Sequence, residues 1–329
     1  MGGPSHDDRL QALARAATAL WDLPETVSLT LINLSENATF RVITADGRHF
    51  ALRLHREGYH SETAIRSELC WLQALRRDRV VLTPVPLPGR NGDLLQRASH
   101  PALARPRFAV LSDWEAGVEP GIGTDLAAPF QALGAAAARM HLHARGFARP
   151  HWFSRPVWDL DAALGDDRPL WGRWRDGLGI DAPKEALFAR SVARIGERLA
   201  AYGKDADRFG LIHCDMRLAN LLIDGDAVKV IDFDDCGFSW FMYDAATTVS
   251  FYEDDPRVPD LIDAWVTGYR RVTPLSAADA AEIPTFLMLR RLLLVAWIGS
   301  HGQTDLARSM GVAYTENTVA LCEAFLART

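Results

Sequence analysis

Cysteine is scarce in this sequence and forms no C-x-x-C pair. The four cysteines stand far apart along the chain, at Cys70, Cys214, Cys236 and Cys322. So sparse a set gives no dense disulfide framework of the kind that holds small secreted domains together. The beginning of the chain also lacks an apolar signal core. Both absences lead us to expect a reduced, cytoplasmic protein.

Long hydrophobic runs and a strong charge of one sign are missing as well. The longest apolar stretches, such as LLLVAWIG at 292–299, are too short to span a bilayer. The net charge is −6, with 24% charged residues. This slightly acidic balance argues against binding nucleic acid or anionic membranes through charge alone. We therefore expect no nucleic-acid or membrane partner, although a local basic pocket for a phosphate-bearing ligand is compatible with the composition.

The chain does have the length and apolar content for a sizeable core. Its 329 residues, 48% of them hydrophobic, suffice for one large or two ordinary domains. An amphipathic helix at 8–21 opens the chain, and a helix at 61–77 has an apolar stripe with Ser61 as its cap. The remaining early segments predict strands at 27–34, 38–45, 48–55, 94–99 and 106–114.

The second part of the chain is mostly helical by pattern. It follows a Gly/Pro linker at 115–123. Helices are predicted at 125–145, 183–201, 257–271, 277–299 and 303–327, and β-like segments only around HCDMRLAN at 213–220. We therefore expect an α+β fold with a β-rich N-terminal lobe at 1–113 and a mostly helical C-terminal lobe at 114–329. The cleft between two such lobes is the default site.

Chemically active residue types gather in two short segments around a predicted hairpin. The first segment is HCDMRLAN, and the second is VKVIDFDD at 228–235. The intervening hairpin, with DGDA at its turn, would fold Asp215 and Asp232 back toward each other. Phosphoryl transfer needs such a set, because a carboxylate must orient and deprotonate an alcohol and oxygen ligands must hold Mg²⁺ on the nucleotide phosphates.

This pattern, H-x-D-x-x-x-x-N followed by a hairpin and I-D-F, resembles the aminoglycoside phosphotransferase and choline kinase superfamily within the protein-kinase-like fold. It resembles the bacterial branch that contains type II homoserine kinases and stress response kinase A. The resemblance implies that Asp215 is the catalytic base, Asn220 a metal ligand and Asp232 the principal Mg²⁺ ligand. His213 is then expected to brace the loop at 213–220, which we term the catalytic loop.

Four neighbouring residues have roles that the resemblance leaves open. Arg217 is a candidate for stabilising charge on the transferred phosphoryl group, or else a surface arginine paired with an acid. Asp234 is a candidate ligand for a second metal, whereas Asp235 is the weaker candidate and can equally cap or turn the chain. Asp244, in the segment YDAA, is expected to anchor the catalytic loop and not to react.

The nucleotide is expected to depend on the third strand. The resemblance places Arg53, in FALRL, where related kinases carry a Lys or Arg that holds the α- and β-phosphates. A carboxylate from the following helix would position it, with Glu68 as the candidate and Glu62 as the alternative. Arginine is always charged and grips phosphate in a bidentate fork. An exposed strand arginine paired with any acid is the competing interpretation.

The predicted loop at 33–40, between the first two strands, contains no glycine. It therefore cannot form a Gly-rich phosphate cover, although Ser35, Asn37 and backbone N–H groups could contact phosphate. The aminoglycoside-kinase branch often lacks these glycines, so the departure weakens only a protein-kinase interpretation. The segment at 110–117 would be the hinge whose backbone binds adenine.

Together these features predict a kinase that uses ATP and Mg²⁺ and phosphorylates a hydroxyl of a small metabolite that is homoserine-, choline- or aminoglycoside-like. A protein Ser/Thr kinase resembling stress response kinase A is the second interpretation. A catalytically silent nucleotide-binding scaffold is the third. The tryptophan-rich segment at 151–174 fits either a cationic acceptor, through cation–π contact, or plain packing. The acceptor, ATP against GTP, the number of metals and the oligomeric state stay open.

Overall fold

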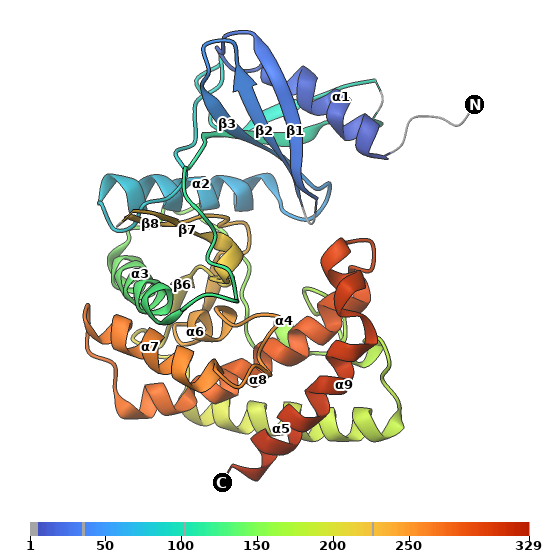
Figure 1. The fold of residues 1–329 in the computed structure, drawn as a ribbon, viewed down its shortest axis with the longest axis vertical. Coiled ribbons are helices and arrows are strands. Elements are labelled where there is room, and N and C mark those ends of the chain that lie inside the picture. Colours follow the sequence, from blue (N-terminus) through green and yellow to red (C-terminus); the bar gives the residue numbers. More distant parts are fainter. Residues whose placement is uncertain (1–5, 35–36, 102, 226, 329) are drawn as a thin grey trace. The chain divides into compact units, whose positions relative to one another are not determined.

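A computed structural model describes residues 6–34, 37–101, 103–225 and 227–328. The chain divides into two compact units (Figure 1). Unit 1 comprises Met1–Ala116 and Arg149–Ser154, and unit 2 comprises Gly117–Ala148 and Arg155–Thr329. The return of 149–154 to unit 1 was not expected from the sequence. Unit 1 contains a five-stranded sheet and unit 2 is mostly helical, so the predicted α+β class is confirmed.

The sheet of unit 1 is antiparallel throughout. Its strands, in spatial order, are β1 (Thr26–Leu34), β2 (Asn37–Thr44), β3 (His49–His55), β5 (Arg107–Asp113) and β4 (Gln96–Ala98). Alternate residues of β2 and β3 are buried, as in a sheet with one face against a core. The register pairs Phe40 with Leu52, which are both fully buried. Strand β1 includes residues 33 and 34, and strand β2 includes residues 37–40. The bounds 33–40 predicted for the loop between these strands are therefore wrong.

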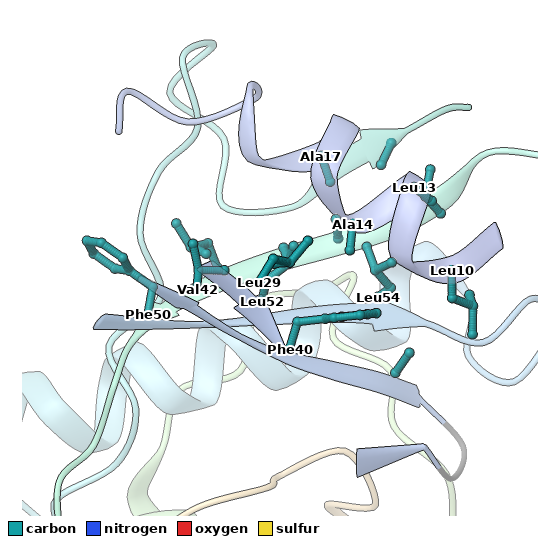
Figure 2. Packing of buried hydrophobic residues seen from close by; sticks show 14 of the residues in the cluster. Leu10, Leu13, Ala14, Ala17, Leu29, Phe40, Val42, Phe50, Leu52 and Leu54 are labelled. Carbon is teal, nitrogen blue, oxygen red and sulfur yellow. The ribbon is translucent and has the colours of Figure 1, made fainter. Parts of the chain in front are cut away.

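Helix α1 (His6–Thr18) closes one face of this sheet. Its buried residues recur at helical spacing: Leu10, Leu13, Ala14 and Ala17. Figure 2 shows these side chains meeting apolar residues of the strands, among them Leu29, Phe40, Val42, Leu52 and Leu54. Burial of each large aliphatic or aromatic side chain contributes about 1.5–3 kcal/mol to folding. This cluster therefore holds β3 in place and fixes the position of Arg53 on it.

Helix α2 (Glu62–Arg77) begins as the sequence predicts. The hydroxyl oxygen of Ser61 accepts the backbone N–H of Ala64 at 3.1 Å, so Ser61 is the N-cap. The apolar stripe of α2 is buried, and Glu68 lies beside it with only 1% of its surface exposed. A carboxylate buried this deeply requires a partner.

Unit 2 is built from seven α-helices among the described residues. They are α3 (Ala127–Gly146), α4 (Leu160–Leu164), α5 (Ala182–Tyr202), α6 (Tyr243–Thr247), α7 (Val258–Arg270), α8 (Ala277–Ser300) and α9 (Asp305–Ala327). Helices α3 and α7 cross at two glycines. A Cβ on Gly134 would lie 1.9 Å from the carbonyl oxygen of Trp265, and one on Gly268 would lie 1.9 Å from that of Gln131. Only glycine permits this approach.

Helix α8 lies in the core of unit 2. Among the described residues it is the one helix long and apolar enough to cross a membrane, yet 78% of that stretch is buried inside the protein. It also carries Arg290 and Arg291, each only 1% exposed. Burial and paired internal charges are the features of a core helix in a globular protein.

Two small antiparallel sheets complete unit 2. They pair β6 (Phe209–Ile212) with β9 (Gly237–Trp240), and β7 (Leu221–Asp224) with β8 (Ala227–Val230). The hairpin that the sequence predicts is β7–β8. Strand β9 was not predicted, because its pairing with β6, distant in the sequence, makes it a strand. The β6–β9 pairing joins the start of the catalytic loop to the chain that follows Asp232.

Candidate functional site

The catalytic loop leaves β6 through a strained residue. Cys214 has φ 66°, in the left-handed region that residues other than glycine rarely occupy. The carboxylate of Asp244, fully buried on α6, holds this conformation. It accepts the backbone N–H of Cys214 at 2.8 Å and that of His213 at 3.2 Å. The prediction that Asp244 anchors the catalytic loop is confirmed.

His213 braces the loop, as expected. Its ring is fully buried. Nδ1 accepts the backbone N–H of Asp215 at 3.2 Å, and Nε2 lies 3.1 Å from the carbonyl oxygen of Ile231. In these two contacts Nδ1 is the acceptor and Nε2 faces a carbonyl oxygen. His213 thus ties the predicted base to the residue that precedes Asp232.

Asp215 lies among three side chains that all donate to its carboxylate. Oδ2 accepts Nδ2 of Asn220 at 2.9 Å and Nε of Arg217 at 3.3 Å, while Oδ1 accepts Nη2 of Arg290 at 2.5 Å. Burial raises the pKa of Asp215, but the positive charges of Arg217 and Arg290 outweigh it and bring the pKa below its ordinary value. The carboxylate is therefore ionised and fixed in orientation.

Asn220 precedes β7 and Asp232 follows β8, so the β7–β8 hairpin lies between them. The backbone N–H of Ile231 donates to the carbonyl oxygen of Asn220 at 2.9 Å, which places Asp232 one residue away. Because Nδ2 of Asn220 faces the oxygens of Asp215, its Oδ1 is directed elsewhere. Asp232 is exposed and has φ 59°, a strained conformation of the kind that clusters at functional sites. These oxygen donors suit a hard divalent cation such as Mg²⁺.

Two residues that the sequence did not single out hold the backbone after Asp232. The guanidinium of Arg155 donates to the carbonyl oxygens of Asp234 and Cys236, the latter at 2.5 Å. The indole N–H of Trp158 donates to the carbonyl oxygen of Asp235 at 2.9 Å. Asp234 is itself 5% exposed. Its part as a second metal ligand stays a prediction.

Arg290 is the main residue of the site that sequence reasoning missed. Besides Asp215, it donates through Nε to Oγ of Ser250 at 2.9 Å and through Nη1 to the hydroxyl of Tyr243 at 3.4 Å. Its guanidinium lies 5.2 Å from the ring centroid of Trp171. Two adjacent arginines in an otherwise apolar helix, LMLRRLLLVAW, were the available signal, because such charges are buried only with partners.

The tryptophan-rich segment belongs largely to the core. Trp158, Trp171 and Trp174 are 3%, 5% and 1% exposed. Trp158 and Trp171 contact each other edge to face, with centroids 4.9 Å apart. Of the two interpretations left open for this segment, packing describes these three residues.

In unit 1, Arg53 and Glu68 form the ion pair that the sequence suggested. Nη2 of Arg53 donates to Oε1 of Glu68, with Arg53 16% and Glu68 1% exposed. The alternative partner, Glu62, pairs instead with Arg66 and Arg97. The pair fixes the guanidinium on β3, but its contact with a nucleotide stays a prediction.

Ser35 and Asn37 are the two residues near the start of β2 that were predicted to contact phosphate. Ser35 lies outside the described residues. Asn37 is the first residue of β2, is 8% exposed, and accepts the backbone N–H of Arg56 through Oδ1 at 3.1 Å. This contact ties β2 to the end of β3. Asn37 therefore has a structural contact that the sequence did not indicate, and phosphate binding by it stays a prediction.

Known proteins are similar to this chain over most of its length. Residues 28–277 match the model of the phosphotransferase enzyme family. The solved structure of a microcompartment-associated aminopropanol kinase is 42% identical, with a TM-score of 0.88 over 95% of this chain and 96% of that chain. The homoserine kinase of Beijerinckia indica is 29% identical over 76% of this chain and 72% of its own length.

A further solved structure shows the fold alone. It is an amicoumacin kinase in complex with AMP-PNP, Ca²⁺ and Ami, 21% identical, with a TM-score of 0.76 over 95% of this chain and 92% of that chain. The three proteins described here are named kinases of small molecules, and the solved structures share the protein-kinase-like fold. With a family match that spans most of its length, the chain belongs to the phosphotransferase enzyme family.

Proposed function

We propose that this protein transfers the γ-phosphoryl group of ATP, with Mg²⁺, to the hydroxyl of a small amino alcohol in the cytoplasm. The observation that carries the proposal is the carboxylate of Asp215, held between Asn220, Arg217 and Arg290. The 42% identity with an aminopropanol kinase supports an amino alcohol as acceptor. Homoserine, the acceptor named for the Beijerinckia relative, is also an amino alcohol.

Asp215 performs the general-base step. Its ionised carboxylate accepts a hydrogen bond from the acceptor hydroxyl and aims the oxygen lone pair at the γ-phosphorus. As the new O–P bond forms, the proton passes to Asp215 and the bond to the leaving ADP breaks. Arg217, which is 27% exposed beside Asp215, stabilises the negative charge that develops on the transferred group.

Asn220, Asp232 and Asp234 are the residues that would hold Mg²⁺. Their oxygens fit a hard cation, and the amide of Asn220 already directs its nitrogen toward Asp215. A bound Mg²⁺ supplies charge neutralisation on the nucleotide phosphates. The amicoumacin kinase complex holds an ATP analogue and a divalent cation, which supports the same pair of ligands here.

Arg53 binds the α- and β-phosphates of ATP in this proposal. Its buried partner Glu68 restricts the guanidinium to one orientation, so less side-chain entropy is lost when phosphate binds. Ser35 and Asn37 remain candidates for a lesser contact with phosphate.

An acceptor panel tests the function. Purified protein is incubated with Mg·ATP and 1-aminopropan-2-ol, ethanolamine, choline, homoserine or an aminoglycoside, and the phosphorylated products are quantified by mass spectrometry. We expect the highest kcat/KM with an amino alcohol that lacks a carboxylate. Casein serves as the protein acceptor and GTP as the alternative donor. Phosphate transfer to casein or to the protein itself, without any phosphorylated small molecule, would overturn the proposal.

A further inference from the structure

Arg290 is fixed in three directions before it reaches Asp215. Nε donates to the hydroxyl oxygen of Ser250 at 2.9 Å, and Nη1 donates to that of Tyr243 at 3.4 Å. The guanidinium also lies over the ring of Trp171, with Cζ 5.2 Å from the ring centroid. A guanidinium is planar and rigid, so fixing Nε and Nη1 also fixes the direction of Nη2. That direction is toward Oδ1 of Asp215, at 2.5 Å.

Ser250 is itself held by the segment that supports the catalytic loop. Its hydroxyl donates to the carbonyl oxygen of Thr247 at 2.7 Å. The hydroxyl oxygen of Thr247 in turn accepts the backbone N–H of Met216, the residue after Asp215, at 2.8 Å. The backbone beside Asp215 and the guanidinium that holds its carboxylate therefore share one anchor.

The two carboxylate oxygens of Asp215 accept hydrogen bonds from different parts of the chain. Oδ2 is held by neighbours on the catalytic loop, Asn220 and Arg217, and Oδ1 by Arg290, 75 positions later in the chain. Rotation of the carboxylate about the Cβ–Cγ bond would move both oxygens, and the loop neighbours oppose this rotation at Oδ2 alone. Arg290 supplies the second fixed point that prevents this rotation.

Stability alone does not account for an arginine at this position. Replacing a buried ion pair by apolar side chains of similar volume is often neutral or stabilising. The run from Leu292 to Ile298, which follows the two arginines on α8, is apolar and buried. What sets Arg290 apart from Arg291, equally buried beside it, is its partner, because that partner is the carboxylate of the proposed base.

We propose that Arg290 is a positioning residue for phosphoryl transfer, which holds the carboxylate of Asp215 in the orientation that meets the acceptor hydroxyl. The proposal rests on the function proposed above, in which Asp215 is the base. Arg290 does not touch the acceptor, because its side chain is only 2% exposed.

Arg291 provides a matched control. It follows Arg290 on the same helix, is equally buried at 1%, and is paired with an acid, Glu253, at 2.8 Å. It also lies over an aromatic ring, that of Tyr314, at 3.5 Å. Its hydrogen bonds run to Thr318, Glu253 and the carbonyl oxygen of Tyr314, and not to Asp215. A purely structural loss should therefore be similar for the two arginines, whereas a loss through Asp215 should be specific to Arg290.

The test compares Arg290→Met, Arg290→Lys and Arg291→Met with the wild type by Tm, kcat and both KM values. We expect Arg290→Met to lower kcat by about 30-fold or more, with the KM for ATP within about twofold, because the positioning acts on the chemical step. Arg290→Lys should regain part of kcat, since an ammonium still reaches one carboxylate oxygen. Arg291→Met should lower Tm as much as Arg290→Met does, but its kcat should stay within about threefold of the wild-type value.

A crystal structure of Arg290→Lys, and of Arg290→Met if it folds, gives a readout that needs no acceptor. We expect the carboxylate of Asp215 to be rotated away from Asn220 in Arg290→Met, and by a smaller angle in Arg290→Lys. A wild-type protein that phosphorylates no acceptor would defeat the proposed function, while the rotation of Asp215 would still decide the role of Arg290. An unmoved carboxylate, or an equal loss of kcat in Arg291→Met, would overturn the positioning role.

Discussion

Asp244 holds Cys214 in the left-handed conformation from which the catalytic loop departs. Its Oδ1 accepts the backbone N–H of Cys214 at 2.8 Å, where φ is 66°. A non-glycine residue in this region costs on the order of 1–3 kcal/mol, which the surrounding structure must offset. Oδ2 of Asp244 is held in turn by His141, at 3.0 Å. A buried acid from α6 thus sets the path of the backbone that carries Asp215.

Replacing Asp244 by alanine should cost both stability and activity. Two buried N–H groups would lose their acceptor, and we expect a loss of about 2–4 kcal/mol in the free energy of unfolding. The rate should fall as well, because the strained turn before Asp215 would relax. Denaturant unfolding and kcat measure the two effects. A variant with wild-type kcat would show that the turn does not depend on Asp244.

Asp232→Ala should abolish the Mg²⁺-dependent stabilisation by ATP. A ligand that binds only the folded protein raises its Tm, and the rise is larger the more tightly the ligand binds. Loss of the principal carboxylate weakens the binding of the metal–nucleotide complex. Thermal shift with and without Mg²⁺ provides the measurement. Asp224→Ala is the control, because Asp224 lies on the same hairpin but pairs with Lys229. An Mg·ATP shift in Asp232→Ala equal to that of Asp224→Ala would refute the metal assignment.

Arg53 and Glu68 should behave as one unit. Arg53→Ala should raise the KM for ATP more than that for the acceptor, and Glu68→Ala should do the same more mildly, because it removes positioning and not the charge. The double variant should be far from additive. Arg53→Lys should keep partial activity, since the charge survives while the planar fork is lost. Additive effects, with a KM for ATP near wild type throughout, would reduce the pair to a structural ion pair.

The pair of Arg66 and Asp93 predicts a specific pH dependence of stability. The hydrogen bonds from Arg66 lower the pKa of Asp93 below its ordinary value of 3.8. A depressed folded-state pKa adds stability that is complete above the ordinary value and is lost as the pH falls through the folded-state value. Both side chains are 36% exposed, so solvent screening limits the contribution to about 0.5–1 kcal/mol.

Asp93→Asn provides the comparison for this pH dependence. The difference in the free energy of unfolding between wild type and variant should be constant from about pH 5 to neutrality and should shrink below about pH 4. Denaturant titrations across this range measure it. A difference that grows on acidification would have the wrong sign for an ionised Asp93 in the pair.

The sequence allowed predictions for residues whose partners are close to them along the chain. The spacing from His213 to Asn220 fits one loop. The pairing of Asp224 with Ala227 closes the β7–β8 hairpin that leads to Asp232, so these residues are close in the fold because they are close in the sequence. Ser61 was identified in the same way, because a cap acts on the next turn of its own helix. The Arg53–Glu68 pair was within reach because β3 leads directly into α2.

Long-range partners could not be predicted in this way. Arg290 and Asp215 are 75 positions apart, and Arg155 and Cys236 are 81 apart. No short-range period relates such residues, since tertiary packing of α8 and of the chain at 155–158 decides which carbonyl or carboxylate they meet. Strand β9 was missed for a related reason, because its pairing with β6 and not its own four residues makes it a strand.

The most direct test of the account follows the γ-phosphoryl group itself. Wild-type protein and Asp215→Asn are given [γ-³²P]ATP, Mg²⁺ and 1-aminopropan-2-ol, and the label in the amino alcohol is measured over time. We predict label on the amino alcohol with the wild type and at least ~10²-fold slower transfer with Asp215→Asn, while Mg·ATP still raises the Tm of the variant. Equal transfer rates for the two proteins, or label that never enters the amino alcohol, would contradict the account.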